Sequence, residues 1–231
     1  MNATVALWGY TQAGKSTALA TYLYGTQPGW VAPLHSVPGL KSLQRIHAEL
    51  ANGALPSGTQ QATEYAVPRQ GGGHVLFRDA KGGNLVYVGH DEADTAFFVQ
   101  AQAAAVFVQW PGWPGDNNTM CTAALRAVEA SPPDQRLALV VTKVESFLPR
   151  GDWAPFMRDP ADYARGRGLP TAFVRLLGAL PKAQVFATTV FGYSEAGLPN
   201  HRQDEFGRYL PVDPRPCGVA EPFDFLLAGL A

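Results

Sequence analysis

The sequence predicts a three-layer α/β domain, with a mainly parallel central sheet, one antiparallel edge hairpin, and helices on both faces. Three observations carry this prediction. Short apolar runs alternate with segments of helical hydrophobic spacing, a pattern typical of parallel sheets covered by helices. A glycine-rich turn joins the first apolar run to the first helical segment. The 231 residues are enough for one large domain, and no domain boundary or internal repeat interrupts residues 1–231.

The first half of the chain is expected to supply four strands and two helices. An apolar strand at residues 4–8 precedes a helix at 16–24, and leucine and isoleucine recur at helical spacing in a second helix at 40–50. Three short strands are expected at residues 64–67, 74–78 and 85–88. The glycine-containing turn at 81–84 predicts that the last two strands pair as the antiparallel edge hairpin.

The second half continues this alternation. Buried strands are expected at residues 104–110, 137–141 and 184–188, and helices at 93–103, 118–130, 171–180 and 223–230. Residues 151–168 are rich in Pro, Arg, Asp and Gly, which predicts a surface insertion, and residues 194–218 read as a polar loop.

Composition and charge argue against several function classes. The chain is 46% apolar and 16% charged with a formal net charge of −1, so no global attraction to nucleic acid or to a membrane surface is expected. No apolar run approaches the roughly 20 residues that span a bilayer, and we expect no signal peptide. Cys121 and Cys217 show no metal or redox spacing. The composition therefore predicts a cytoplasmic protein without direct membrane insertion.

Residues 9–16 carry the strongest chemical signal. They fit the pattern G-x-x-x-x-G-K-[ST] at every fixed position, between a strand and the start of a helix. The glycines let backbone N–H groups wrap a phosphate chain, and the helix N-terminus adds its dipole. We expect Lys15 to act as a catalytic residue at the outer phosphates and the Ser16 hydroxyl to hold Mg²⁺. The predicted phosphate contacts are Gly9, Thr11, Gln12, Ala13, Gly14, Lys15, Ser16 and Thr17.

A second signal follows the strand at 137–141, where the chain reads Thr142-Lys143-Val144-Glu145. This segment resembles the base-recognition motif of GTPases, [NT]-K-x-D. There the carboxylate accepts hydrogen bonds from the guanine N1–H and amino group, a donor pair that adenine lacks. Thr142, Lys143 and Glu145 are therefore predicted base contacts, although Glu145 is one methylene longer than the usual Asp. The alternative is a Lys/Glu pair on a solvated strand end.

A third segment, residues 185–192, falls where GTPases place a strand followed by a loop whose backbone N–H contacts the guanine O6. Thr188 and Thr189 are the predicted contacts here. Hydroxyl residues are frequent at strand ends, so this segment only supports the other two.

In this order, residues 9–16, 142–145 and 188–192 resemble the translation-factor-related (Ras-like) class of P-loop GTPases. Residues 55–59, 188–192 and 217–223 together also resemble bacterial double-GTPase-type domains, which occur beside effector modules in bacterial conflict systems. The resemblance implies a P-loop NTPase fold, GTP or GDP with Mg²⁺ as cofactors, and a protein effector or regulator as partner.

The resemblance further implies a threonine in a first switch loop that closes on Mg²⁺ and the γ-phosphate. Thr59 and Thr63 are the candidates, and Thr59 is preferred as a metal-binding and catalytic residue because it follows Pro56-Ser57-Gly58. The alternative is a turn-forming threonine in a polar loop.

The second switch departs from the family pattern, in which a strand ends in D-x-x-G. Asp79-Ala80-Lys81-Gly82 has these letters, but the predicted hairpin turn places it away from the phosphates. Residues 89–94 lie between a predicted strand and a helix but lack the glycine. Position favours Asp91 as the Mg²⁺ carboxylate, with Glu92 and Asp94 as alternatives. His90 is a candidate to orient the catalytic water, or a structural loop-end histidine.

These observations favour a guanine-nucleotide-binding regulatory switch with slow intrinsic hydrolysis, because no water-orienting Gln or arginine finger is evident. One alternative is an ATP-dependent enzyme of the small-molecule kinase type, with Arg158, Arg165 and Arg167 as lid residues. Another is a nucleotide-binding scaffold that does not hydrolyse.

Overall fold

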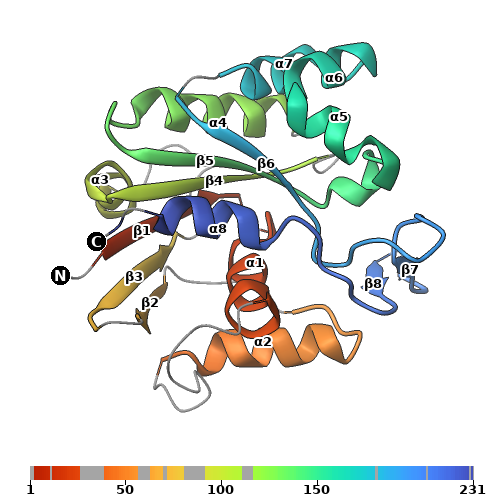
Figure 1. Cartoon of the computed structure of the whole chain (residues 1–231), viewed down its shortest axis with the longest axis horizontal. Helices are drawn as coiled ribbons and strands as arrows, with labels where there is room; N and C mark the ends of the chain where they lie inside the picture. The colour runs from red at the N-terminus through yellow and green to blue at the C-terminus, as the bar shows by residue number, and fades with distance from the viewer. Residues whose placement is uncertain are drawn as a thin grey trace.

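The computed structural model describes residues 3–10, 12–26, 39–56, 63–69, 72–80, 92–110, 117–179, 182–206, 208–228 and 230. Six strands form its main sheet (Figure 1): β1 (Ala3–Gly9), β2 (Thr63–Pro68), β3 (His74–Asp79), β4 (Ala103–Gln109), β5 (Arg136–Thr142) and β6 (Gln184–Thr188). Their order across the sheet is β2-β3-β1-β4-β5-β6. All neighbouring pairs run parallel except β2 and β3, which are antiparallel.

Helices cover both faces of this sheet. They are α1 (Lys15–Thr21), α2 (Lys41–Ala51), α3 (Glu92–Gln100), α4 (Asn117–Ala130), α5 (Trp153–Arg158), α6 (Pro160–Gly166), α7 (Thr171–Leu177) and α8 (Ala220–Leu227). Figure 1 shows α1, α2 and α8 on one side of the strands and α4, α6 and α7 on the other. The predicted three-layer α/β fold class is therefore confirmed.

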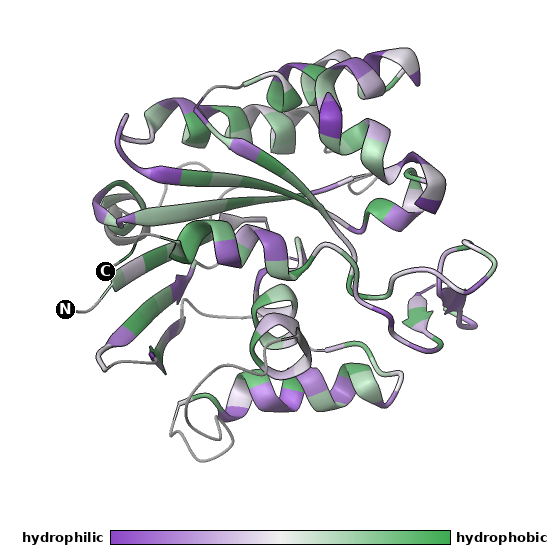
Figure 2. Cartoon of the chain, viewed as in Figure 1, coloured by the Kyte–Doolittle hydropathy of each residue, from purple (hydrophilic) through white to green (hydrophobic). Residues whose placement is uncertain are grey.

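The core follows from the apolar strands. The side chains of β4 from Ala103 to Val108 and of β5 from Leu137 to Val141 are all buried, as expected for central parallel strands covered on both faces. Figure 2 shows hydrophobic residues concentrated along the central strands and hydrophilic ones on the outer faces of helices such as α2. A rigid apolar sheet thus supports the loops at its carboxyl edge.

The edge hairpin is formed by different strands from those predicted. β3 pairs with β1 on one side and with β2 on the other along its whole length. Both edges of β3 are therefore occupied, and a hairpin with residues 85–88 is wrong. Residues 81–91, which include that segment, lie outside the described residues.

Three other segments differ from the simplest sequence interpretation. The first helix continues into a π-helix at Tyr22–Thr26. The predicted insertion at 151–168 holds α5 and α6, whose Phe156 and Ala164 are buried. The polar loop at 194–218 contains a small hairpin of β7 (His201–Gln203) and β8 (Tyr209–Pro211). Within the described residues, no helix is long and apolar enough to cross a membrane.

Candidate functional site

The candidate site lies at the carboxyl edge of the sheet. Gly9, Asp79, Gln109, Thr142 and Thr188 are the last residues of β1, β3, β4, β5 and β6, which are mutually parallel. The strand order switches sides at β1: β2 and β3 lie on one side of β1, and β4 to β6 lie on the other. Open α/β sheets bind ligands at this point, outside the carboxyl ends of the strands.

The turn after β1, which is the predicted phosphate loop, has an unusual backbone. Gly9 has φ +152°, Gly14 has φ +84°, and the exposed Gln12 has φ +64°. Among the described residues, Gln12 and Lys143 are the non-glycine residues with positive φ. Such backbone costs of order 1–3 kcal/mol per residue and gathers at functional sites. Both strained residues belong to segments that the sequence assigns to nucleotide binding.

Gly9 is required at its position by close packing. A Cβ built on Gly9 would lie 2.5 Å from the Phe107 carbonyl oxygen and 2.9 Å from the Phe107 Cβ, both on the neighbouring strand β4. The phosphate loop can therefore leave β1 in this direction only where residue 9 has no side chain.

We expect Gly9→Ala to destabilise the fold by roughly 3 kcal/mol or more, since it combines overpacking against rigid backbone with a strained φ. Thermal unfolding should show this loss as a lower midpoint. Gly72→Ala is a matched control, because Gly72 also has positive φ but a Cβ there meets nothing within 4 Å. If both variants lost the same small amount, close packing at Gly9 would not be what requires glycine.

Lys15 reaches back over the phosphate loop. Its Nζ donates hydrogen bonds to the carbonyl oxygens of Gly9 at 2.9 Å and Tyr10 at 3.2 Å, and lies 3.7 Å from Asp79 Oδ1. The Ser16 hydroxyl donates to Asp79 Oδ2. Lys15 and Asp79 are buried, with exposed fractions of 6% and 0%. An ammonium, a hydroxyl and a carboxylate therefore meet beside the amides of the loop.

This arrangement corrects the expectation that Asp79 lies away from the phosphates. Because β3 pairs in parallel with β1, its last residue reaches the same edge as the phosphate loop, with Asp79 opposite Leu7. The residues preferred from the sequence, Asp91 and His90, lie outside the described residues. The two alternatives, Glu92 and Asp94, belong to α3, where only their backbone is described.

The base-recognition segment is joined to the phosphate loop. The Thr142 hydroxyl donates to the Ala13 carbonyl at 2.9 Å. Lys143 then adopts a left-handed backbone with φ +57° and starts a short 3-10 helix, Val144–Ser146, which contains Glu145. The two predicted nucleotide segments, more than 120 residues apart in the chain, are thus in direct contact.

Glu145 is 8% exposed, so it does not stand on a solvated strand end, and that alternative is wrong. Burial raises the pKa of its carboxyl, while a hydrogen bond with Thr189 and the charge of Lys143 lower it. Its Oε2 has no hydrogen-bond partner among the described residues. Burial lowers the pKa of Lys143, against the opposing charge of Glu145. A buried carboxylate with an unused oxygen is suited to a ligand that brings its own N–H donors.

Thr188 and Thr189 are buried and engaged within the protein. The Thr188 hydroxyl donates to the Val141 carbonyl at 3.3 Å. The Thr189 amide donates to the Cys217 carbonyl at 3.0 Å, and its hydroxyl accepts from the Gly192 amide at 2.9 Å. The Thr189 amide is therefore occupied, whereas the Val190 amide has no partner among the described residues. No residue pattern in this segment distinguishes these adjacent amides.

Other predicted residues are placed less completely. Thr17 lies half-buried in α1, and Thr63 opens β2 opposite Asp79. Thr11 and Thr59 lie outside the described residues. The proposed lid residues Arg165 and Arg167 form exposed ion pairs within their own segment, with Asp162 and Asp152, and Arg158 ends α5.

The described residues hold no group of three or more His, Cys, Asp or Glu side chains that would bind a metal ion by itself. Ser16 and Asp79 nevertheless bring a hydroxyl and a carboxylate oxygen together beside the phosphate loop. Oxygen ligands of this kind suit Mg²⁺, which is usually bound by one or two carboxylates together with substrate phosphates and water. The residues present thus fit Mg²⁺ delivered with a nucleotide.

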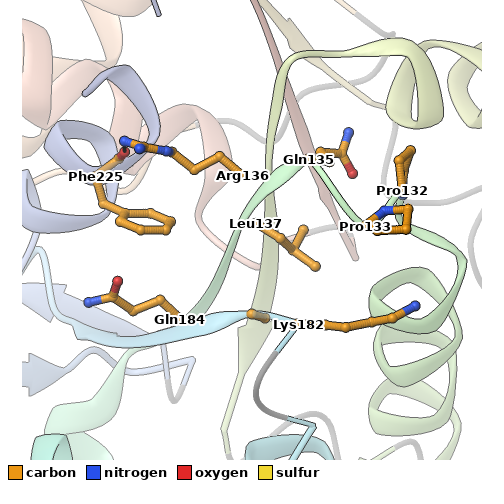
Figure 3. Close-up of a pocket in the computed structure, with 9 residues that line it drawn as sticks. Pro132, Pro133, Gln135, Arg136, Leu137, Lys182, Gln184 and Phe225 are labelled. Carbon is orange, nitrogen blue, oxygen red and sulfur yellow. Dashed lines mark hydrogen bonds between the residues drawn. The ribbon is translucent and has the colours of Figure 1, made fainter. Parts of the chain in front are cut away.

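A surface pocket of about 380 Å³ lies at the opposite edge of the sheet, where β5 and β6 begin (Figure 3). Two of its lining residues are basic, but Arg136 donates to the Phe225 carbonyl at 2.8 Å and Lys182 to the Glu129 carbonyl at 2.7 Å. Figure 3 shows both side chains extending away from Leu137. Their charges stabilise carbonyls of α8 and α4 and do not converge on the pocket.

Comparison with known proteins adds little. No protein-family model and no curated protein matches the chain. A solved structure of the G domain of the T. maritima FeoB iron transporter is similar over 86% of this chain and 92% of that one, with 17% identity and a TM-score of 0.39.

Proposed function

We propose that this protein is a guanine-nucleotide-binding P-loop GTPase that acts as a regulatory switch with slow intrinsic hydrolysis. One observation carries the proposal: the Thr142–Ala13 hydrogen bond joins the predicted phosphate loop to the segment that holds Glu145, a buried carboxylate with an unused oxygen. A nucleotide needs both features, at its phosphates and at its base. An inorganic anion site needs only the first.

The phosphate half of the site is electrostatic. Backbone amides of residues 10–16 would surround the phosphates, and Lys15 would move its hydrogen bonds from the Gly9 and Tyr10 carbonyls to the outer phosphate oxygens. Ser16 and Asp79 would hold Mg²⁺, with Asp79 in the role that the sequence predicts for Asp91. When bound, Mg²⁺ supplies charge stabilisation at the β- and γ-phosphates.

The base half selects by hydrogen-bond complementarity. Glu145 would accept from the N1–H and amino group of guanine through oxygens that include the unused Oε2. The Val190 amide would donate to O6, the contact that the sequence predicts for Thr188 and Thr189. Adenine presents the opposite pattern and would leave the buried carboxylate without partners, which a site of this kind rejects strongly.

Hydrolysis would depend on parts beyond the phosphate loop. Asp79 is followed by Ala80-Lys81-Gly82, so the chain has the full D-x-x-G letters at the position where the structure places the carboxylate. This weakens the case for a non-hydrolysing scaffold. Thr59 and His90 stay proposed for closure on the γ-phosphate and for orienting water. With no described residue assigned as an arginine finger, a protein partner would raise the rate.

Calorimetric titration in Mg²⁺ buffer tests the proposal. GTP, GDP and non-hydrolysable analogues should bind, with GDP at least about 100-fold tighter than ADP, and phosphate release from GTP should be slow. Equal binding of guanine and adenine nucleotides would favour the ATP-dependent alternative. No binding of any purine nucleotide would refute the function.

Glu145→Gln should remove the guanine preference and weaken GDP binding about 10- to 100-fold, because a hydrogen bond to a charged group is lost. The nucleotide-free variant should be more stable than wild type at pH 7. Burial raises the folded-state pKa of Glu145, so its contribution favours folding at low pH and is lost as pH rises through that raised pKa. Titration and thermal unfolding of one preparation measure both effects.

The raised pKa of Glu145 also predicts how GDP binding by the wild type depends on pH. As the pH is lowered, GDP affinity should begin to fall at a higher pH than it would if the pKa of Glu145 were that of an ordinary glutamate. Glu49→Gln, in α2, is a control that should leave nucleotide selectivity unchanged. Retained selectivity in Glu145→Gln would remove its assigned role.

A further inference from the structure

The carboxyl end of β4 makes two side-chain hydrogen bonds with the base-recognition segment. Gln109 Oε1 accepts from Lys143 Nζ at 2.8 Å, and the Trp110 carbonyl accepts from the Ser146 hydroxyl at 2.9 Å. Gln109 also stands opposite Thr142 in the β4–β5 register. Nothing in the sequence motifs indicated a role for this end of β4.

This end of β4 is a fixed support. Trp110 is 5% exposed and stacks on Phe173 of α7, with ring centroids 4.5 Å apart and an interplanar angle of 17°. Phe147, which follows the 3-10 helix, packs edge-on against the same Phe173 ring. The Lys143 carbonyl, 2.8 Å away, shares this same Ser146 hydroxyl proton with the Trp110 carbonyl. Both ends of the 143–146 turn are therefore tied to β4 and α7.

Lys143 needs such support. Its long side chain has many rotamers, and its ammonium is taken out of water, which lowers its pKa. The charge of Glu145 acts on this ammonium, but Glu145 would turn to the base when nucleotide binds. Within the part of the chain that the structure describes, the Lys143 ammonium donates its side-chain hydrogen bond to Gln109. The lysine stem keeps one direction while this bond holds.

We propose that Gln109 is a positioning residue for the purine. The resemblance to the GTPase base motif implies that the aliphatic stem of Lys143 packs over the purine, and Gln109 would hold the Lys143 ammonium so that the stem keeps this place. This rests on the proposed function and deepens it. Packing against a purine face does not depend on which exocyclic groups the base has. Gln109 therefore sets affinity for guanine and adenine nucleotides alike, whereas Glu145 sets the choice between them.

Three variants test this assignment. Gln109→Met keeps the length of the side chain but removes the acceptor, and should weaken GDP and ADP binding by the same factor, about tenfold, with their ratio unchanged. Gln109→Glu restores an acceptor and should bind GDP within about threefold of wild type. Gln184→Met is the matched control, since Gln184 is exposed at the amino end of β6, the opposite edge of the sheet.

Wild-type affinity for Gln109→Met, or an equal loss in Gln109→Glu, would overturn the proposal, as would a change in the GDP/ADP ratio. A readout without nucleotide separates this result from failure of the proposed function. By NMR of the Lys143 side chain, its pKa should fall further in Gln109→Met and rise in Gln109→Glu. If these shifts occurred but no purine nucleotide bound the wild type, the support would be real and the function wrong. If neither variant shifted the pKa, the Gln109 assignment itself would fail.

Discussion

Lys15→Met is expected to weaken binding of GTP and GDP by at least about 100-fold. The lost interaction is a charge-assisted contact with phosphate, and removing a comparable preorganised donor costs about 3–4 kcal/mol. The ammonium already lies at the loop, bonded to the Gly9 and Tyr10 carbonyls, so wild type spends little free energy to place it. Fluorescent-nucleotide titration in Mg²⁺ buffer measures the loss.

The nucleotide-free variant should also be less stable. Asp79 is fully buried, and Lys15 is the cation 3.7 Å away. Removing one member of a buried ion pair costs roughly 3–5 kcal/mol, because the other charge is left uncompensated. Adding Asp79→Asn to Lys15→Met should therefore recover stability without recovering nucleotide affinity. A double-mutant cycle would measure the coupling energy between the two side chains.

Lys182→Met is the control for Lys15→Met, since Lys182 binds a helix carbonyl at the far edge of the sheet. It should bind nucleotide as wild type does. Undiminished triphosphate binding by a folded Lys15→Met protein would contradict the phosphate-loop assignment directly, whatever the base preference.

Asp79→Asn is expected to remove most of the Mg²⁺ dependence of GTP binding. In wild type, adding Mg²⁺ to EDTA-treated protein should raise GTP affinity about 10- to 100-fold, and in Asp79→Asn by less than about threefold. The amide keeps the volume of the side chain and an oxygen for Ser16, but it loses the charge that a divalent cation requires. Titrations with Mg²⁺ and with EDTA give the two numbers.

Asp213→Asn serves as the control, because Asp213 is exposed in the chain after β8 and pairs with Arg215. Asp91→Asn belongs in the same series. If Asp91→Asn, and not Asp79→Asn, abolished the Mg²⁺ effect, Asp91 would be the Mg²⁺ carboxylate, as the sequence predicts. The contact between Ser16 and Asp79 would then be structural only.

Much of the fold was predictable from local patterns. β6 has the predicted bounds, and β1, β4 and β5 differ from prediction by one or two residues, because continuous apolar runs mark buried parallel strands. The end of the first helix was less predictable. A π-helix at Tyr22–Thr26 has no signal in the local sequence, whereas Tyr22 stacks on Phe223 of α8, about 200 residues away in the chain.

The candidate site divides in the same way. The spacing of Gly9, Gly14, Lys15 and Ser16 is local, so the sequence by itself was enough to predict a phosphate loop and its chemistry. The sequence also determined that a Thr-Lys-x-Glu segment follows a buried strand. Only the tertiary structure decided that this segment touches the phosphate loop and that its carboxylate is buried.

Asp79 shows the physical reason most clearly. The same apolar strand at 74–79 is compatible with a hairpin to residues 85–88 or with pairing to β1 and β2, because alternation along a strand does not name its neighbours. Because β3 pairs in parallel with β1, Asp79 lies beside Ser16 and not in a distant hairpin turn. Local chemistry was readable from the chain, whereas strand pairing between distant segments brought that chemistry together.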